Sequence, residues 1–269
     1  MPDPIIQLAG VSVRFGRQQV LRNVHLDIFS HETLALIGES GCGKSVALKL
    51  IVGLLQPTEG EVYFEGKPLH RMREREIVAM RQRVGFLFQG AALFDSLTVF
   101  DNVAFGLRAK GLKRHEDLEP RVRSSLRDVG LTVAAESKMP AELSGGMRKR
   151  VGLARALAID PDVMLYDEPT TGLDPIMTDV INELIVQTRA NRPITSLVVT
   201  HEMRTVQKVA DRVVMFYPHA RLTAHEPQVI YDGPAAGLTT CNDARVRQFV
   251  LGEARERLTD SRLLSESDA

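Results

Sequence analysis

The sequence has no tryptophan, only two cysteines and no net charge among its 269 residues. Cys42 and Cys241 stand far apart, so they form neither a disulfide framework nor a cysteine metal cluster, which fits a reducing compartment. The 34 basic residues balance 34 acidic ones. This balance excludes a strongly basic nucleic-acid surface and a strongly acidic disordered chain, and we expect no nucleic-acid partner.

Long hydrophobic runs are absent as well. No apolar stretch approaches the roughly 20 residues that a membrane-spanning helix needs. The first residues show no basic stretch followed by an apolar core, so no signal peptide is visible. We expect a soluble, cytoplasmic chain, long enough for one large α/β domain or two small ones with a substantial core.

Hydrophobic patterning predicts strands and helices in an α/β order. Strands are expected at 5–15 and 20–28 (a hairpin around a turn at 15–17), 33–37, 61–64, 163–167, 196–200 and 212–217. Helices are expected at 44–55, 71–83 and 243–258, and the pattern is helical from about 95 to 155. The arrangement predicts an α/β fold interrupted by a helical insert.

A glycine-rich segment between a predicted strand and a predicted helix carries the first chemical signal. It reads Gly38, Glu39, Ser40, Gly41, Cys42, Gly43, Lys44 and Ser45, a G-x-x-x-x-G-K-[ST] match. Its glycines let backbone N–H groups surround phosphate oxygens, Lys44 adds a positive charge and Ser45 offers a hydroxyl to Mg²⁺. The chain is therefore predicted to bind a nucleoside triphosphate, with ATP and Mg²⁺ as its cofactors.

Two acids end the predicted strand at 163–167. Carboxylates at the C-terminal edge of a parallel strand face the crevice in which α/β sheets bind ligands. Asp167 is predicted to hold Mg²⁺, directly or through water, and Glu168 to polarise the attacking water. The alternative is an ordinary acidic pair at a strand-to-turn junction.

A second glycine motif, Leu143–Met147, precedes another helical run. Ser144 is a candidate N-cap, and Gly145 and Gly146 leave N–H groups exposed at a positive helix end. One triphosphate does not need two such cradles in one chain, so the second cradle is predicted to close over a nucleotide held by another subunit. A plain helix start is the alternative.

Together these motifs resemble the ATPase subunits of ABC transporters. The phosphate loop, residues 143–147, 166–169, 172–175 and 200–202 occur in that family's order, and the resemblance covers roughly residues 5–235. It implies a P-loop NTPase fold with a RecA-like core, an N-terminal antiparallel β subdomain and an inserted α-helical subdomain. We expect the ATPase domain at 1–240, with its insert at about 90–155, and a C-terminal helix and tail at 241–269.

The resemblance also assigns roles to single residues. Phe15 resembles the aromatic residue that stacks on adenine, although it could be a core aromatic of the hairpin. Gln89 matches the glutamine that senses Mg²⁺ and water, and His201 matches the histidine that contacts the γ-phosphate. Asp174 matches the D-loop, which joins the two sites of a head-to-tail dimer. One departure stands out: Met147 replaces the usual glutamine, and a thioether cannot make an amide's hydrogen bonds.

Residues 88–103 narrow the resemblance to the ATPases of Mla/Mce-type phospholipid transporters. Met147 and residues 245–249 point the same way. The resemblance implies a dimer of this chain beneath an integral permease, at the cytoplasmic face of the inner membrane, with an Mce-domain lipid-binding protein and a small STAS-domain protein as further partners.

Two surfaces have alternative interpretations. Residues 90–92 either leave a groove for a partner's helix or pack as a tight loop on their own core. The C-terminal helix places Val246, Phe249, Val250, Ala254 and Leu258 near one face, which either packs on its own domain or clasps the neighbouring ATPase subunit.

Two other functions are alternatives to this interpretation. A soluble ABC protein acting on DNA or ribosomes usually has two ATPase halves, a coiled-coil arm or zinc pairs, and this sequence has a single phosphate loop, no C-x-x-C and no heptad arm. An ATPase that imports a polar solute is the second alternative, and residues 88–103 argue against it.

Overall fold

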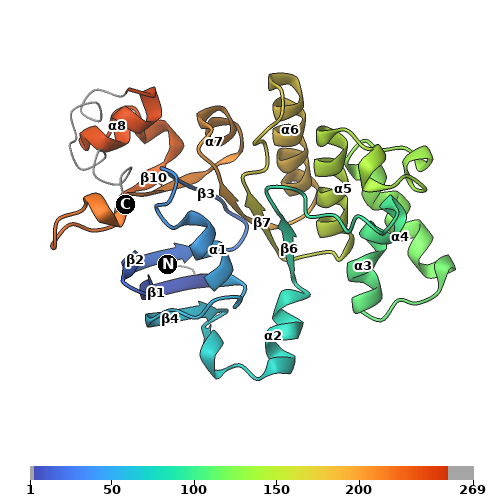
Figure 1. The fold of residues 1–269 in the computed structure, drawn as a ribbon, viewed down its shortest axis with the longest axis horizontal. Helices are drawn as coiled ribbons and strands as arrows, with labels where there is room; N and C mark the ends of the chain where they lie inside the picture. Colours follow the sequence, from blue (N-terminus) through green and yellow to red (C-terminus); the bar gives the residue numbers. More distant parts are fainter. Residues whose placement is uncertain (1–2, 254–269) are drawn as a thin grey trace.

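The computed structural model describes residues 3–253, drawn as a ribbon in Figure 1. Its strands are β1 (Ile6–Phe15), β2 (Gln18–Ile28), β3 (Thr33–Gly38), β4 (Glu59–Phe64), β5 (Lys67–Pro68), β6 (Val84–Leu87), β7 (Val163–Asp167), β8 (Thr195–Val199), β9 (Arg212–Phe216) and β10 (Val229–Pro234). Its α-helices are α1 (Lys44–Ile51), α2 (Glu74–Arg81), α3 (Val99–Ala109), α4 (His115–Asp128), α5 (Gly145–Ala158), α6 (Pro175–Asn191), α7 (Met203–Val209) and α8 (Ala244–Leu251).

The central sheet has the strand order β10-β9-β3-β8-β7-β6. Its strands are parallel except for β10, which pairs antiparallel with β9. All six residues of β3 are buried, as expected of a strand covered on both faces. Because β3 and β7 both end at the same edge of this sheet, the phosphate loop after β3 and the acids after β7 come together.

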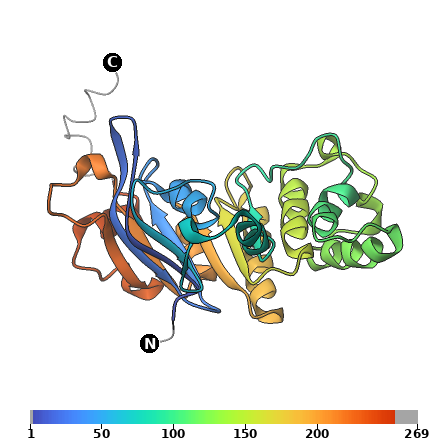
Figure 2. The same cartoon turned by 90° about the horizontal axis from the view of Figure 1, so that it is seen from below.

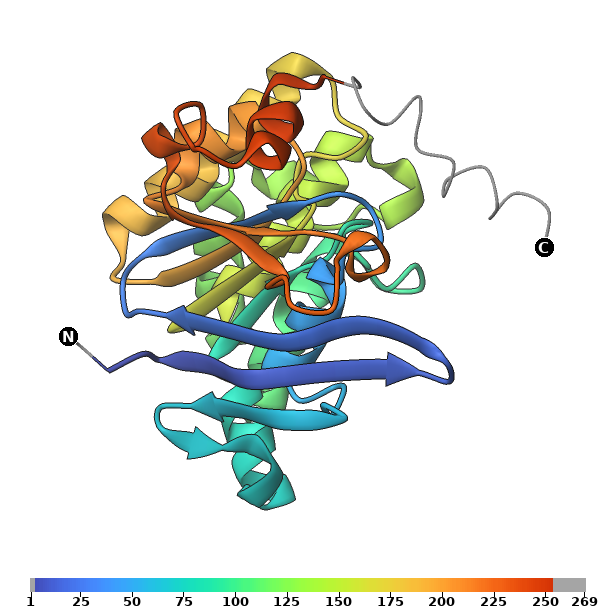
Figure 3. The same ribbon diagram turned by 90° about the vertical axis from the view of Figure 1, so that its left-hand side faces the viewer.

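A second, antiparallel sheet has the order β2-β1-β4-β5. The long hairpin of β1 and β2 lies beside β4, as Figure 3 shows. Ile6 and Leu21 of this hairpin share one hydrophobic cluster with Leu48 of α1. The hairpin predicted from the sequence is therefore present, and it is fastened to the helix that follows the phosphate loop.

Helices α3, α4 and α5 pack together at one end of the elongated molecule (Figure 2). Val103, Leu126 and Leu153 belong to their shared core. This cluster also includes Tyr166 of β7 and Ile181 of α6. The helical insert predicted from the sequence is thus joined to the parallel sheet through α5.

Three predicted helices are shorter than expected. Helix α1 ends at Ile51 instead of residue 55, because the amide of Leu54 turns back to the carbonyl of Lys49 at 2.8 Å. Helix α2 covers 74–81 instead of 71–83. Helix α8 ends at Leu251, where Gly252 takes the left-handed conformation (φ +66°) that closes many helices.

The face of α8 packs on its own domain. Val246 is fully buried, and Phe249 and Val250 pack against the same cluster. Ala254 and Leu258, predicted for this face, lie outside the described residues. A contact of this region with a neighbouring subunit stays a prediction. Among the described helices, none is long and apolar enough to cross a bilayer.

Candidate nucleotide-binding and catalytic site

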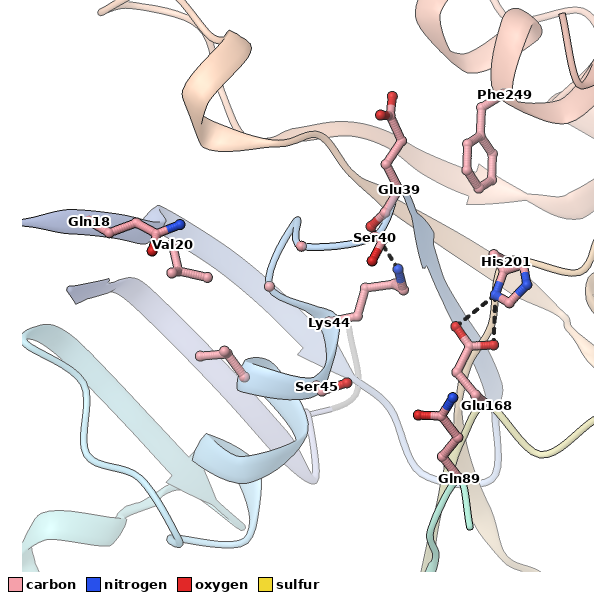
Figure 4. A pocket seen from close by; sticks show the side chains of 13 residues that line it. Gln18, Val20, Glu39, Ser40, Lys44, Ser45, Gln89, Glu168, His201 and Phe249 are labelled. Carbon is pink, nitrogen blue, oxygen red and sulfur yellow. Dashed lines mark hydrogen bonds and ion pairs between the residues drawn. The ribbon is translucent and has the colours of Figure 1, made fainter. Parts of the chain in front are cut away.

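The phosphate loop borders a cavity of about 730 Å³, which Figure 4 shows from close by. Its lining comes from the β1–β2 hairpin, the phosphate loop, the start of α1, the segments that follow β6, β7 and β8, and helix α8. These residues are Gln18, Val20, Glu39, Ser40, Gly41, Gly43, Lys44, Ser45, Val46, Gln89, Glu168, His201 and Phe249. Segments far apart in the sequence thus meet around one hollow.

The phosphate loop has the geometry that the sequence predicts. Gly38 has φ +144°, and a Cβ there would lie 2.3 Å from the carbonyl oxygen of Phe216, so only glycine fits. The Lys44 ammonium donates to the carbonyl oxygens of Gly38 at 2.7 Å and Glu39 at 2.9 Å. These contacts hold the lysine nitrogen inside the curve of the loop. Cys42 is buried below it, and this burial raises the pKa of its thiol.

Ser45 and Asp167 lie together on one side of the loop. The Ser45 hydroxyl donates to Asp167 Oδ1 at 3.3 Å. Burial raises the pKa of the Asp167 carboxyl, against the opposing hydrogen bond from Ser45. The positive charge of a bound cation would offset the cost of burying the ionised carboxylate. Both groups are oxygen donors of the kind Mg²⁺ prefers, since this ion usually takes one or two carboxylates together with substrate phosphates. The residues present therefore fit Mg²⁺.

Glu168 is held in a defined orientation between two partners. His201 Nδ1 lies 2.9 Å from Glu168 Oε1 and 2.8 Å from Oε2 (Figure 4). The Thr171 hydroxyl donates to Oε2 at 3.1 Å. The backbone of Glu168 is left-handed, with φ +48°. Such strain in a non-glycine residue costs about 1–3 kcal/mol and clusters at functional sites. Glu168 is thus fixed in place with its carboxylate facing the cavity.

Gln89 and His201 reach the cavity from the ends of β6 and β8, the two strands that flank β7. Gln89 is the second residue after β6, and His201 is the second residue after β8. Both side chains line the same hollow as Lys44 and Ser45. The structure thus brings together all three residues predicted for catalysis, namely Glu168, His201 and Gln89.

Eight predicted residues do not line this cavity, namely Gly38, Cys42 and Asp167, described above, and Phe15, Ser144, Gly145, Gly146 and Asp174. Phe15 lies at the end of β1, 49% exposed and paired with Gln18, which does line it. Ser144 caps α5, accepting a hydrogen bond from the amide of Met147 at 3.3 Å, and Gly145 and Gly146 begin that helix. Asp174 caps α6 through the amides of Ile176 and Met177. The cap predicted for Ser144 is present.

Four lining residues were missed in the sequence: Val46, which lies in the helix after the phosphate loop, and Gln18, Val20 and Phe249. Gln18 and Val20 follow the Gly16 turn, where the hairpin prediction gave them no separate signal. Phe249 comes from α8, which the sequence placed on its own or a neighbouring domain but not at the nucleotide. In Figure 4 its ring stands beside Glu39 and His201. Only tertiary packing brings α8 to this place.

The family model described as "ABC transporter" matches residues 21–171. This range contains the phosphate loop, the signature segment (residues 143–147) and the acidic pair after β7. The chain belongs to the ABC transporter family. It is an ABC transporter ATPase, and in this family ATP hydrolysis is coupled to transport.

Two curated relatives give the range of substrates. The intermembrane phospholipid transport system ATP-binding protein MlaF of Haemophilus influenzae is 39% identical over 254 residues, covering 94% of this chain and 93% of the relative. The methionine import ATP-binding protein MetN of Carboxydothermus hydrogenoformans is 45% identical over 202 residues, covering 74% of this chain and 59% of the relative. Both relatives are transporter ATP-binding proteins, and their names give different substrates, phospholipids and methionine.

A solved structure supports the fold. A dimeric ATP-binding cassette in a post-hydrolysis state with ADP and phosphate matches with a TM-score of 0.75 and 30% identity, over 86% of this chain and 98% of that one. The two-sheet α/β architecture with its helical insert is therefore that of an ABC ATPase, as the sequence predicted.

Proposed function

We propose that this chain is the ATP-hydrolysing subunit of a transporter that moves phospholipids between bacterial inner and outer membranes. The observation that carries this proposal is the similarity to MlaF, which extends over 94% of the chain and 93% of the relative. A match over the whole length includes residues 88–103 and the region of α8, where the sequence resembles lipid-transporter ATPases.

The arrangement of the cavity supports specific roles in hydrolysis. The phosphate loop and Lys44 hold the phosphates. Ser45, Asp167 and Gln89 would hold Mg²⁺, which would neutralise negative charge on the phosphates. Glu168 accepts a proton from the attacking water, oriented by its contact with His201, which also reaches the γ-phosphate. Water then displaces ADP from the terminal phosphoryl group.

The placement of the signature segment supports a site shared by two chains. Ser144 and Gly145 are exposed and do not line the cavity around Lys44. Their N–H groups at the positive end of α5 suit an anion brought by another subunit. In a head-to-tail dimer, each cavity would be closed by the partner's signature segment, with Asp174 near the junction. Phe15 lies half exposed at the hairpin tip, and its proposed role is to stack on the base.

An aromatic hollow supports docking of a permease helix. Phe86, Phe88, Phe94 and Phe105 line a cavity of about 440 Å³ together with Ala92. Phe88, Phe94 and Phe105 are 38%, 42% and 47% exposed. Large exposed aromatics gathered in one hollow are typical of a protein–protein contact. Of the residues predicted for a groove, Ala92 lines this hollow while Ala91 is buried, and a partner's helix in the hollow stays a prediction.

Replacing Phe94 and Phe105 by serine should release the permease. Their rings are 4.5 Å apart, so the double variant removes both halves of one apolar contact. Each anchor is worth about 2 kcal/mol or more, roughly 30-fold in affinity. The measurement is recovery of the permease with the tagged ATPase, using Val186→Ser on α6 as the control. Equal recovery from the double variant and the control would contradict docking at this hollow.

Co-purification from detergent-solubilised membranes tests the proposed cargo. An integral permease recovered together with a protein carrying an Mce domain, with or without a STAS-domain protein, is the expected result. A periplasmic solute-binding protein in their place would overturn phospholipid transport.

Import of a small polar solute is the second candidate. The similarity to MetN favours it, because the identity is 45% over the 202 residues matched to MetN and 39% over the 254 residues matched to MlaF. The match reaches only 59% of MetN, whereas it reaches nearly the whole of MlaF. The co-purification experiment separates the two candidates.

A further inference from the structure

Lys149 is a buried cation that the assigned chemistry does not use. It lies on α5, five residues after Ser144, and only 5% of its surface is exposed. Burial lowers the pKa of its ammonium, while the nearby charges of Glu168 and Asp167 oppose that shift. Burying a charged side chain is costly unless it is hydrogen-bonded, so its partners are informative.

The ammonium of Lys149 joins two segments of the catalytic cavity. It donates to the carbonyl oxygen of Gln89 and, at 3.1 Å, to the carbonyl oxygen of Glu168. Both acceptors are backbone atoms of residues whose side chains line the cavity. The Glu168 carbonyl belongs to the left-handed turn after β7, so Lys149 holds the strained backbone of the residue proposed as the base.

Helix α5 grips the glutamine loop (residues 88–92) at two further points. Arg155 donates to the carbonyl oxygens of Ala91 and Ala92, both at 2.7 Å, and both residues have left-handed backbones. At Gly152 the helix approaches so closely that a Cβ would lie 3.2 Å from the Ala91 Cβ. The glutamine loop is therefore fastened to α5 by Arg155 and Lys149. Lys149 also connects this helix to Glu168.

We propose that Lys149 is a positioning residue that fixes the backbone of Glu168 and Gln89 to the signature helix α5. The base Glu168 and the signature segment at the start of α5 then move together. A displacement of Ser144, which serves the partner's nucleotide in the proposed dimer, shifts the base of this chain's own site. The inference rests on Glu168 being the base, and it adds a residue that acts on hydrolysis without touching the substrate.

The experiment compares three substitutions at Lys149 with one matched control. Lys149→Met keeps the aliphatic stem and removes the donors, Lys149→Gln keeps an amide donor without charge, and Lys149→Arg keeps charge and donors. Lys110→Met is the control, because Lys110 also donates to a backbone carbonyl, that of Ile159, but at the far ends of α3 and α5. Steady-state ATPase rates of the purified chain give kcat and KM for each variant.

We expect Lys149→Met to lower kcat about 10- to 100-fold, as loss of a supporting hydrogen bond commonly does. The KM for ATP should stay within about twofold, since the phosphate loop is untouched. Lys149→Gln should fall between Met and wild type, Lys149→Arg should recover most of the rate, and Lys110→Met should match wild type.

Two outcomes would overturn the assignment. One is an unchanged kcat in Lys149→Met. The other is a loss of kcat together with ATP affinity in both Met and Gln variants without recovery by arginine, which would make Lys149 a general folding residue. Glu168→Gln measured in parallel keeps the base assignment separate: if that variant hydrolyses ATP normally, the assumed base is wrong, whatever Lys149 does. The cargo is not involved in either measurement.

Discussion

Glu168→Gln should lower the rate of ATP hydrolysis by 10²–10⁴-fold, or roughly 3–5 kcal/mol in activation free energy, while ATP still binds. The glutamine keeps the size of the side chain but cannot accept the proton of the attacking water. His201 and Thr171, the partners of the carboxylate oxygens, lie outside the phosphate loop, so that loop keeps its geometry. The variant should accumulate as an ATP-bound dimer because binding continues and hydrolysis does not.

Two measurements check this result, the ATPase rate and the apparent mass in the presence of ATP. Glu116→Gln on α4 is the matched control, since it makes the same chemical change at an exposed position outside the cavity. A Glu168→Gln variant that hydrolyses ATP at the wild-type rate would contradict the base assignment. A variant that stays monomeric with ATP would contradict the shared site.

The core of the site could be predicted from the sequence because its chemistry is local. Residues 38–45 form one continuous loop, and their glycine positions follow from close backbone contacts such as that between Gly38 and Phe216. Asp167 and Glu168 end an apolar strand, and parallel strands present their C-terminal ends at one edge. Continuous motifs next to a buried strand therefore lead directly to the cavity.

Other parts were beyond sequence reasoning because they depend on tertiary contacts. The segment 84–94 gave no strand signal, yet Val84–Leu87 forms the edge strand β6, where Gly85 packs so closely that a Cβ would meet the Met164 sulfur at 2.3 Å. Strand β10 was not predicted either, and among the described strands it pairs with β9 at the other edge of the sheet. Lys149 appears in the sequence as one more cation in a helix, and its role emerges only from the two carbonyls that it reaches.

Lys44→Ala should weaken ATP binding by about 10- to 150-fold. A hydrogen bond to a charged group is worth about 1.5–3 kcal/mol, and 1.4 kcal/mol corresponds to a factor of ten. Lys44 is 8% exposed, and its ammonium lies 2.7 Å from the Gly38 carbonyl oxygen within the loop. Alanine therefore removes both the charge at the phosphates and the contacts that keep the loop curved.

The measurement is the dissociation constant for ATP by calorimetry or a fluorescent analogue, with Lys49→Ala as the matched control. Lys49 lies on the same helix, five residues later, with an exposed side chain. Equal affinities of the two variants would contradict the role of Lys44 in phosphate binding. The pattern also differs from that of Glu168→Gln, because loss of Lys44 reduces binding itself whereas loss of the base leaves ATP bound. Together the two variants separate the binding of the triphosphate from its hydrolysis.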